Sequence, residues 1–154
     1  RGHGVIVNVS SVAGRVAGPL NGIYAASKHA LEALTESLNL EAGHFGVRAH
    51  VIEPGGIDTA FIGNRRAVGA AAGKDSPYAP LVKEWEEGIA RMSGALGSRT
   101  QAPAVAEIIL EAIEKGEKLR YAAGQDAQMV LMARKQMDDE TFESTMRQQL
   151  GLTW

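Results

Sequence analysis

The chain has 154 residues, of which 45% are hydrophobic and 22% charged, and its net charge is -2. This length can bury a single core, and the small charge gives no electrostatic footprint for nucleic acid or an anionic membrane. Cysteine is absent, which excludes disulfides and thiolate zinc sites, and no apolar run approaches the ~20 residues that span a bilayer. We therefore expect a cytoplasmic protein without nucleic-acid or membrane partners.

Residues 4–9 form a short, β-branched apolar run, a pattern typical of a strand buried on both faces of a parallel sheet. Ser10 and Ser11 follow this run directly. Because open α/β sheets bind ligands in the crevice beyond the carboxyl ends of their strands, hydroxyls at this point face a candidate site.

Residues 21–43 have apolar positions at helical spacing and predict a long helix. Tyr24 and Lys28 lie one turn apart on it, so they share a face. A phenol titrates near pH ~10, and a neighbouring ammonium lowers that pKa by favouring the phenolate. The pair therefore indicates proton transfer to or from an oxygen, although a surface Tyr beside a solvated Lys gives the same spacing.

Residues 47–53 predict a second strand, which ends at Pro54, Gly55 and Gly56 because a strand interior does not tolerate that sequence. Ile57, Asp58 and Thr59 follow. In βαβ order, the first strand end, the helix with Tyr24 and this Gly-rich turn meet at one edge of the sheet.

Beyond the turn, residues 60–77 lose periodicity and predict a mobile segment or a disordered insert. Its Gly69–Asp75 stretch is a near miss for a phosphate-binding loop, and we interpret it as a flexible loop. The remaining expected elements are helices over residues 78–92 and 104–114, a strand over residues 119–123 and a Met-rich helix over residues 128–150.

The sequence does not predict a metal site. His3, His29, His44 and His50 form no i, i+4 pair with a third ligand nearby, so we interpret all four as solvated or capping residues.

Taken together, three stretches resemble the short-chain dehydrogenase/reductase family: residues 8–14, the Tyr24 to Lys28 segment and residues 54–59, with the helix over residues 30–38 between the last two. The resemblance implies an α/β fold, the C-terminal half of a Rossmann-like doubly wound parallel sheet with about three strands and flanking helices. It further implies a nicotinamide-dependent oxidoreductase that interconverts an alcohol and a carbonyl, with NAD or NADP as the cofactor.

By position, the resemblance implies that Ser11 hydrogen-bonds the substrate oxygen and that Tyr24 is the acid/base. Lys28 matches the lysine that lowers the phenol pKa and binds the nicotinamide ribose. The residues implied to hold the cofactor are Tyr24, Lys28, Pro54, Gly55, Ile57 and Thr59.

The family's Gly-x-Gly-x-x-Gly turn, which cradles the cofactor pyrophosphate, is not present in these 154 residues. We therefore expect residues 1–154 to be a single partial domain that lacks the N-terminal cofactor-binding half. Two alternatives stay open: a catalytically inactive fragment, and a noncatalytic interaction module that retains the fold. Without the N-terminal half, the first strand has one edge whose backbone groups are unpaired. This edge predicts a complementing N-terminal segment or a homo-oligomer.

The expected substrate is a small alcohol or carbonyl compound. Phe61 and Ile62, with Trp85 and Met92 in the next helix, are candidates to line an apolar pocket and so favour an apolar substrate.

Overall fold

The computed structural model describes residues 2–61, 75–96 and 99–153, with side chains described up to Met92 in the second range. The strands are β1 (Gly4–Val9), β2 (Val47–Pro54), β3 (Ile57–Asp58), β4 (Thr100–Gln101) and β5 (Arg120–Ala123). The helices are η1 (Val12–Gly14), α1 (Gly22–Gly43), α2 (Ala79–Leu96), α3 (Ala102–Glu114), α4 (Gln125–Gln136) and α5 (Asp139–Leu150).

A parallel sheet of three strands, in the order β1-β2-β5, forms the centre of the molecule. β1 pairs along its whole length with β2, from Gly4 opposite Val47 to Val9 opposite Ile52. The short strands β3 and β4 form a separate parallel pair. The α/β class and the three flanked strands expected from the sequence are confirmed.

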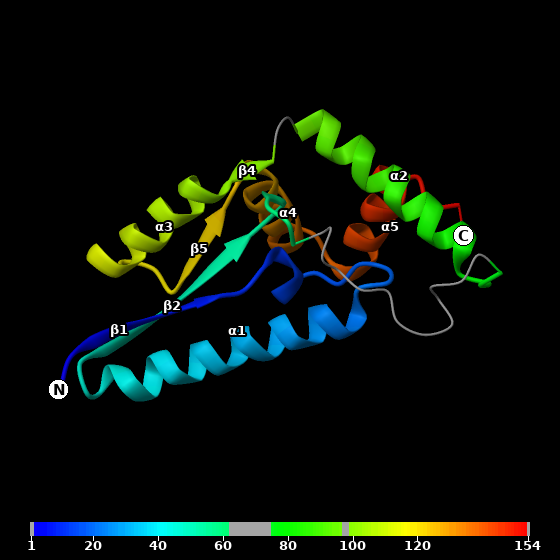
Figure 1. Ribbon diagram of the computed structural model, residues 1–154. Coiled ribbons are helices and arrows are strands. Elements are labelled where there is room, and N and C mark those ends of the chain that lie inside the picture. Colours follow the sequence, from blue (N-terminus) through cyan, green and yellow to red (C-terminus); the bar gives the residue numbers. More distant parts are fainter. Residues whose placement is uncertain (1, 62–74, 97–98, 154) are drawn as a thin grey trace.

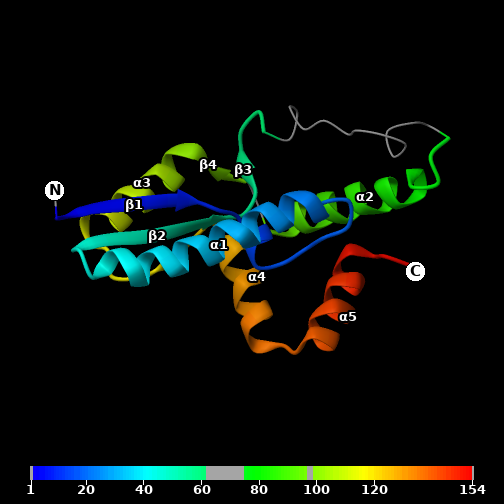
Figure 2. The ribbon, with the colours of Figure 1, turned by 90° about the horizontal axis from the view of Figure 1, so that it is seen from below.

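The two faces of this sheet differ in chemistry. Helix α3 covers one face and α1 covers the other (Figure 1; Figure 2). On the α3 face Ile52, Tyr121 and Ala123 pack with Val105 and Ala112 into an apolar core. On the α1 face polar groups meet: Asn8 of β1 donates to the Thr35 hydroxyl of α1 over 2.8 Å, and Glu32 and Glu53 are both 4% exposed.

The expectation that the first strand is buried on both faces is wrong for the described chain. Residues Gly4 to Asn8 of β1 are half-buried and Val9 is 44% exposed. The reason is position, because β1 is the outer strand of the described sheet, whereas β2 in the middle is fully buried from Ala49 to Pro54.

The tail expected to be one helix consists of two. Met137 adopts an extended conformation after α4, and the Asp138 carboxylate caps α5 by accepting a hydrogen bond from the Thr141 amide over 2.8 Å. Hydrogen bonding by the Thr141 side chain, and then by its amide, lowers the pKa of Asp138. Phe142 is buried, but Met129 and Met132 are more than half exposed. The methionine spacing therefore does not mark one continuous packed face.

The interpretation of all four histidines as solvated or capping is wrong for His50. His50 is 3% exposed, its ring lies edge-on to Tyr121, and its Nδ1 lies 2.7 Å from the Lys118 carbonyl oxygen. Within the described residues there is no group of three or more His, Cys, Asp or Glu side chains that could hold a metal ion. The same residues contain no helix that is both long and apolar enough for a membrane span.

Candidate functional site

Ser11 lies at the carboxyl end of β1 and begins η1. Its backbone is extended (φ -172°), and its hydroxyl accepts a hydrogen bond from the Ala13 amide over 3.1 Å. The same hydroxyl donates to the Pro54 carbonyl over 3.5 Å. This second bond is long enough to be weak, so the hydroxyl can turn toward a substrate oxygen without a large loss.

Tyr24 and Lys28 occupy the first two turns of α1, and the structure brings them together. The Lys28 ammonium lies 5.6 Å from the centre of the Tyr24 ring. It donates to the Val9 carbonyl at the end of β1 over 2.9 Å, which fixes it between the helix and the strand that leads to Ser11. An ammonium has three donors, so two have no partner within the described part of the chain and are available to a ligand.

The Pro54 turn closes the same edge of the sheet. The Gly55 amide donates to the Ala123 carbonyl over 3.1 Å, and the Gly56 carbonyl accepts from the Thr100 amide over 3.0 Å. Ile57 is half-buried in β3, whereas Thr59 is exposed and its hydroxyl accepts from the Phe61 amide over 3.4 Å. Thr59 therefore lies beyond the turn, with a side chain open to a ligand.

Asp126 supports this turn from α4. Its carboxylate accepts a hydrogen bond from the Gly56 amide over 2.6 Å. A Cβ on Gly55 would collide with the same carboxylate. The turn therefore needs glycine at position 55 for space, and Asp126 is a positioning residue that the sequence did not reveal.

The expected apolar lining residues are placed differently by the structure. The Phe61 ring lies 5.8 Å from the Tyr24 ring at a tilt of 49°. Trp85 of α2 packs against Gly18, in the loop between Ser11 and Tyr24. Met92 is half-buried in α2, whereas Ile62, the fourth expected lining residue, and Gly69–Lys74 lie outside the described residues.

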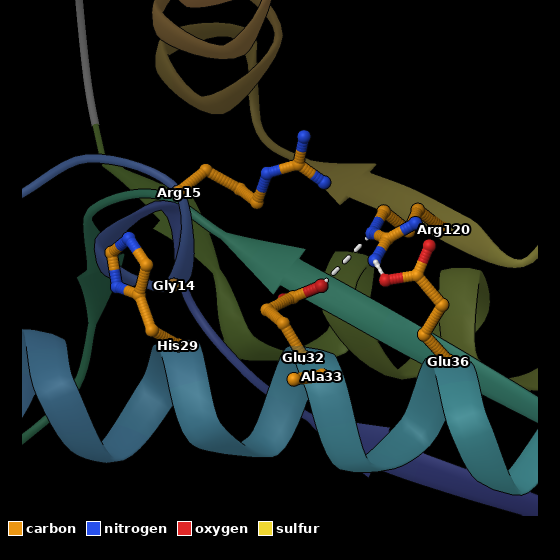
Figure 3. Close-up of a pocket in the computed structure, with 7 residues that line it drawn as sticks. All are labelled: Gly14, Arg15, His29, Glu32, Ala33, Glu36 and Arg120. Atoms are coloured by element: carbon orange, nitrogen blue, oxygen red, sulfur yellow. Dashed lines mark hydrogen bonds and ion pairs between the residues drawn. The ribbon is translucent and has the colours of Figure 1, made fainter.

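Four charged side chains, which we call the Arg120 cluster, lie between the sheet and α1. They are Arg120 of β5, Glu53 of β2, and Glu32 and Glu36 of α1. Arg120 Nε lies 2.9 Å from Glu32 Oε2 and 4.0 Å from Glu53 Oε1, and a terminal nitrogen of Arg120 lies 3.2 Å from Glu36 Oε2. Figure 3 shows Arg120 reaching from β5 to the two glutamates of α1. Arg15 and His29 join them around a pocket of about 280 Å³.

Burial raises the pKa of Glu53 to about 6, and the negative charge of Glu32 adds to that rise while Arg15 and Arg120 oppose it. For Arg120, burial alone would lower the pKa. The hydrogen bonds and charges of Glu32 and Glu36 outweigh burial and raise it. Arg120 is therefore a fixed cation, and Glu53 exchanges a proton with solvent at a pH of about 6.

Sequence reasoning missed Asp126 and the Arg120 cluster because the partners are far apart in the chain. Arg120 and Glu32 are separated by 88 residues. One signal was available: a charged residue next to the apolar pair Val51 and Ile52 near the end of a strand, as Glu53 is, needs a buried partner.

Comparisons with known proteins point to one family. The profile of the short chain dehydrogenase family matches residues 1–70. An uncharacterised oxidoreductase of Schizosaccharomyces pombe is 33% identical over 153 residues, covering 97% of this chain and 61% of that protein. An uncharacterised NAD-dependent oxidoreductase of Mycobacterium tuberculosis is 58% identical over 59 residues, which are 38% of this chain and 22% of that protein.

A solved structure shares the fold of this chain. The crystal structure of a short chain dehydrogenase from Burkholderia cenocepacia, solved with NADP, superposes with a TM-score of 0.65 at 22% identity, covering 99% of this chain and 48% of that one. The chain thus spans about half of that structure and about three fifths of the yeast relative. The matched profile, the relatives and the shared fold together place the chain in the short-chain dehydrogenase/reductase family of oxidoreductases.

Proposed function

We propose that this chain carries the proton-transfer centre of an NAD(P)-dependent oxidoreductase that interconverts an alcohol and a carbonyl compound. The observation that carries the proposal is the placement of the Lys28 ammonium beside the Tyr24 ring, at the edge of the sheet where Ser11 and the Pro54 turn meet. This edge is where open α/β sheets bind their ligands.

In the proposed reaction each residue acts at a stated atom. The Tyr24 hydroxyl exchanges a proton with the substrate oxygen, and the Ser11 hydroxyl holds that oxygen. Lys28 supplies positive charge beside the phenol and donates to the cofactor ribose. A bound nicotinamide would accept a hydride from the substrate carbon in the oxidation and would return one in the reduction.

The residues present fit the nicotinamide end of such a cofactor. Within the described residues Lys28 uses one donor, on Val9, which leaves two for a ligand. Thr59 is exposed and its hydroxyl can donate a hydrogen bond to a carboxamide. Gly55 and Gly56 carry no side chains, so a flat ring can approach the turn closely. A relative named as NAD-dependent and a neighbour solved with NADP support a nicotinamide cofactor without choosing between the two.

The substrate proposed here is an apolar alcohol or carbonyl compound. The Phe61 ring supplies apolar surface beside Tyr24. Trp85 adds an apolar ring against Gly18, in the loop that joins Ser11 to the helix carrying Tyr24.

The test is Tyr24→Phe, which removes the hydroxyl and keeps the ring. It is made in the product of the complete gene and assayed with secondary alcohols and both cofactors by the absorbance of the reduced nicotinamide. We expect kcat/KM to fall by about 100- to 10,000-fold, the usual contribution of general acid-base catalysis. Tyr78→Phe is the matched control because Tyr78 is 51% exposed at the start of α2. Wild-type turnover in the Tyr24 variant refutes the proposal.

Measurements of cofactor binding and of turnover distinguish this proposal from the two alternatives, an inactive fragment and a noncatalytic module. Calorimetry of the 154-residue chain with NAD and NADP measures cofactor affinity directly. Tight binding by this chain alone argues against the inactive fragment, and turnover by the product of the complete gene argues against the module.

A further inference from the structure

The Arg120 cluster differs from an ordinary surface ion pair because two of its carboxylates are buried. The side chains of Glu32 and Glu53 are 5% and 6% exposed, and the single guanidinium of Arg120 lies between them. Exposed pairs contribute little to stability, but buried carboxylates without full compensation are costly. This arrangement therefore needs a reason other than the strength of the pairing.

Stability does not supply that reason. Among the described residues, Ser10 Oγ, Glu32 Oε1 and Glu53 Oε1 are buried without a hydrogen-bond partner. Burial also opposes the ionised form of Glu53. Apolar side chains of similar volume often replace such groups with no loss of stability. A buried, imperfectly satisfied charge near a site is instead characteristic of groups kept for function.

The location of the cluster shows what it can position. Glu32 lies one turn after Lys28 on α1, and Glu53 immediately precedes Pro54 on β2. Arg120 projects from β5 and bonds the helix while facing Glu53. One side chain therefore links the helix that presents the acid/base to the strand end that begins the cofactor turn.

We propose that Arg120 is a positioning residue for the proposed reaction. Its planar guanidinium fork holds α1, which carries Tyr24 and Lys28, in a fixed position relative to the end of β2. Glu53 is its contact on β2. The inference rests on the proposed function. The fork matters because Nε and a terminal nitrogen of Arg120 bond different carboxylates, Glu32 and Glu36. A lysine has the same charge but lacks this planar geometry.

The first test compares Arg120→Met and Arg120→Lys in the product of the complete gene. Arg48→Met is the matched control, because Arg48 also joins the sheet to a helix, donating to the Ile113 carbonyl over 2.9 Å, but on the α3 face. Unfolding by urea gives stability, and steady-state kinetics give kcat and KM separately.

We expect Arg120→Lys to recover most of the stability lost in Arg120→Met while kcat stays at least about tenfold low, since small misplacements of reacting groups reduce rates strongly. We expect Arg48→Met to lose stability with kcat nearly unchanged. If Arg120→Lys restores stability and kcat together, the role is charge compensation and the inference is overturned. It is also overturned if kcat in Arg120→Met matches that of the Arg48 variant.

Glu53→Gln provides a second test that does not depend on a destabilised fold, because glutamine removes a charge that burial opposes. The charged groups that act on this carboxyl are Glu32, Arg15 and Arg120. In the wild type we expect the pH profile of kcat/KM to have a step at about 6, where Glu53 titrates. In Glu53→Gln we expect that step to be absent, and its persistence contradicts the role of Glu53.

Hydrogen exchange gives a readout that does not need turnover. In Arg120→Met we expect faster exchange in the first half of α1 and in residues 55–59, with α3 unchanged. Uniform acceleration over the whole sheet indicates a general structural role and overturns the inference. If Tyr24→Phe keeps full activity, the proposed function fails by itself. If only the Tyr24 variant is inactive and the Arg120 variants behave like Arg48→Met, this inference fails alone.

Discussion

The carboxylate of Asp126 accepts a hydrogen bond from the amide of Gly56 over 2.6 Å, although 70 residues separate the two in the chain. The bond joins the first turn of α4 to the turn that follows β2. A charged acceptor strengthens such a bond, because ionised groups make shorter and stronger hydrogen bonds than neutral ones.

Replacing Asp126 by Ala is expected to lower the free energy of unfolding by about 1–3 kcal/mol, because the Gly56 amide loses its charged acceptor. The turn residues should also bind the nicotinamide end less well, which raises the cofactor Kd. Urea unfolding and calorimetry measure the two effects. Asp139→Ala is the control, since Asp139 pairs with Arg134 on an exposed surface. Equal stability in the Asp126 variant and the wild type contradicts the assignment.

Glu53→Gln is expected to stabilise the protein at about pH 8 by at most about 2 kcal/mol. The pKa of Glu53 is raised from 4.5 to about 6 in the folded state. Its proton therefore stabilises the fold fully below about pH 4.5, and this contribution is lost as the pH rises through 6. Urea unfolding near pH 4.5 and pH 8 measures the difference.

The matched control is Glu36→Gln, because Glu36 contacts the same arginine but is 56% exposed. We expect that variant to change the free energy of unfolding by less than about 1 kcal/mol, because exposed ion pairs contribute little. A Glu53→Gln gain that is the same at both pH values argues against a raised pKa.

Gly18→Ala is expected to displace Trp85, since the added Cβ would lie 2.7 Å from Cη2 of that ring. Overpacking of this kind costs about 1–3 kcal/mol, and a shifted indole changes its fluorescence emission. Trp154→Phe leaves Trp85 as the sole tryptophan of these 154 residues. Gly22→Ala is the control because its Cβ meets no atom within 4 Å. An unchanged emission spectrum shows that the loop containing Gly18 moves and that Trp85 keeps its position.

Phe61→Ala is expected to change catalysis more than stability. The ring is 59% exposed and lies 5.8 Å from the Tyr24 ring, so its loss should alter stability by less than about 0.5 kcal/mol. We expect KM for apolar substrates to rise by about 10-fold or more, because a large apolar contact is removed. Phe45→Ala is the control, as Phe45 is 68% exposed near the other end of α1. Equal KM values in the two variants contradict a substrate-facing role.

The sequence predicted the main strands and helices because their signals are local. Periodicity placed the long helix within one residue of α1 (Gly22–Gly43), and the Pro54 turn marked the end of β2. The local signal for the break in the tail was present but was outweighed by helical spacing. Asp138 followed by Asp139 and Glu140 is an N-terminal capping pattern.

The candidate site was predictable only where one motif holds its parts together. Tyr24 and Lys28 share a helix, so their proximity follows from spacing. Glu53 and Arg120 come from different strands, and their approach depends on β2 lying beside β5 with Val51 opposite Arg120. Pairing between strands distant in sequence is set by the whole fold, and no local pattern encodes it.

The polar character of the α1 face also affects how firmly α1 is oriented. Aliphatic packing is non-directional, so a helix held only by apolar contacts can rotate about its axis or slip along it at modest cost. Helix α1 is instead held to the strands by Lys28 on Val9, Thr35 on Asn8 and Glu32 on Arg120. These bonds are spread along its length and each has a preferred angle. Together they fix the rotation of the helix about its own axis and therefore the direction in which the Tyr24 phenol points.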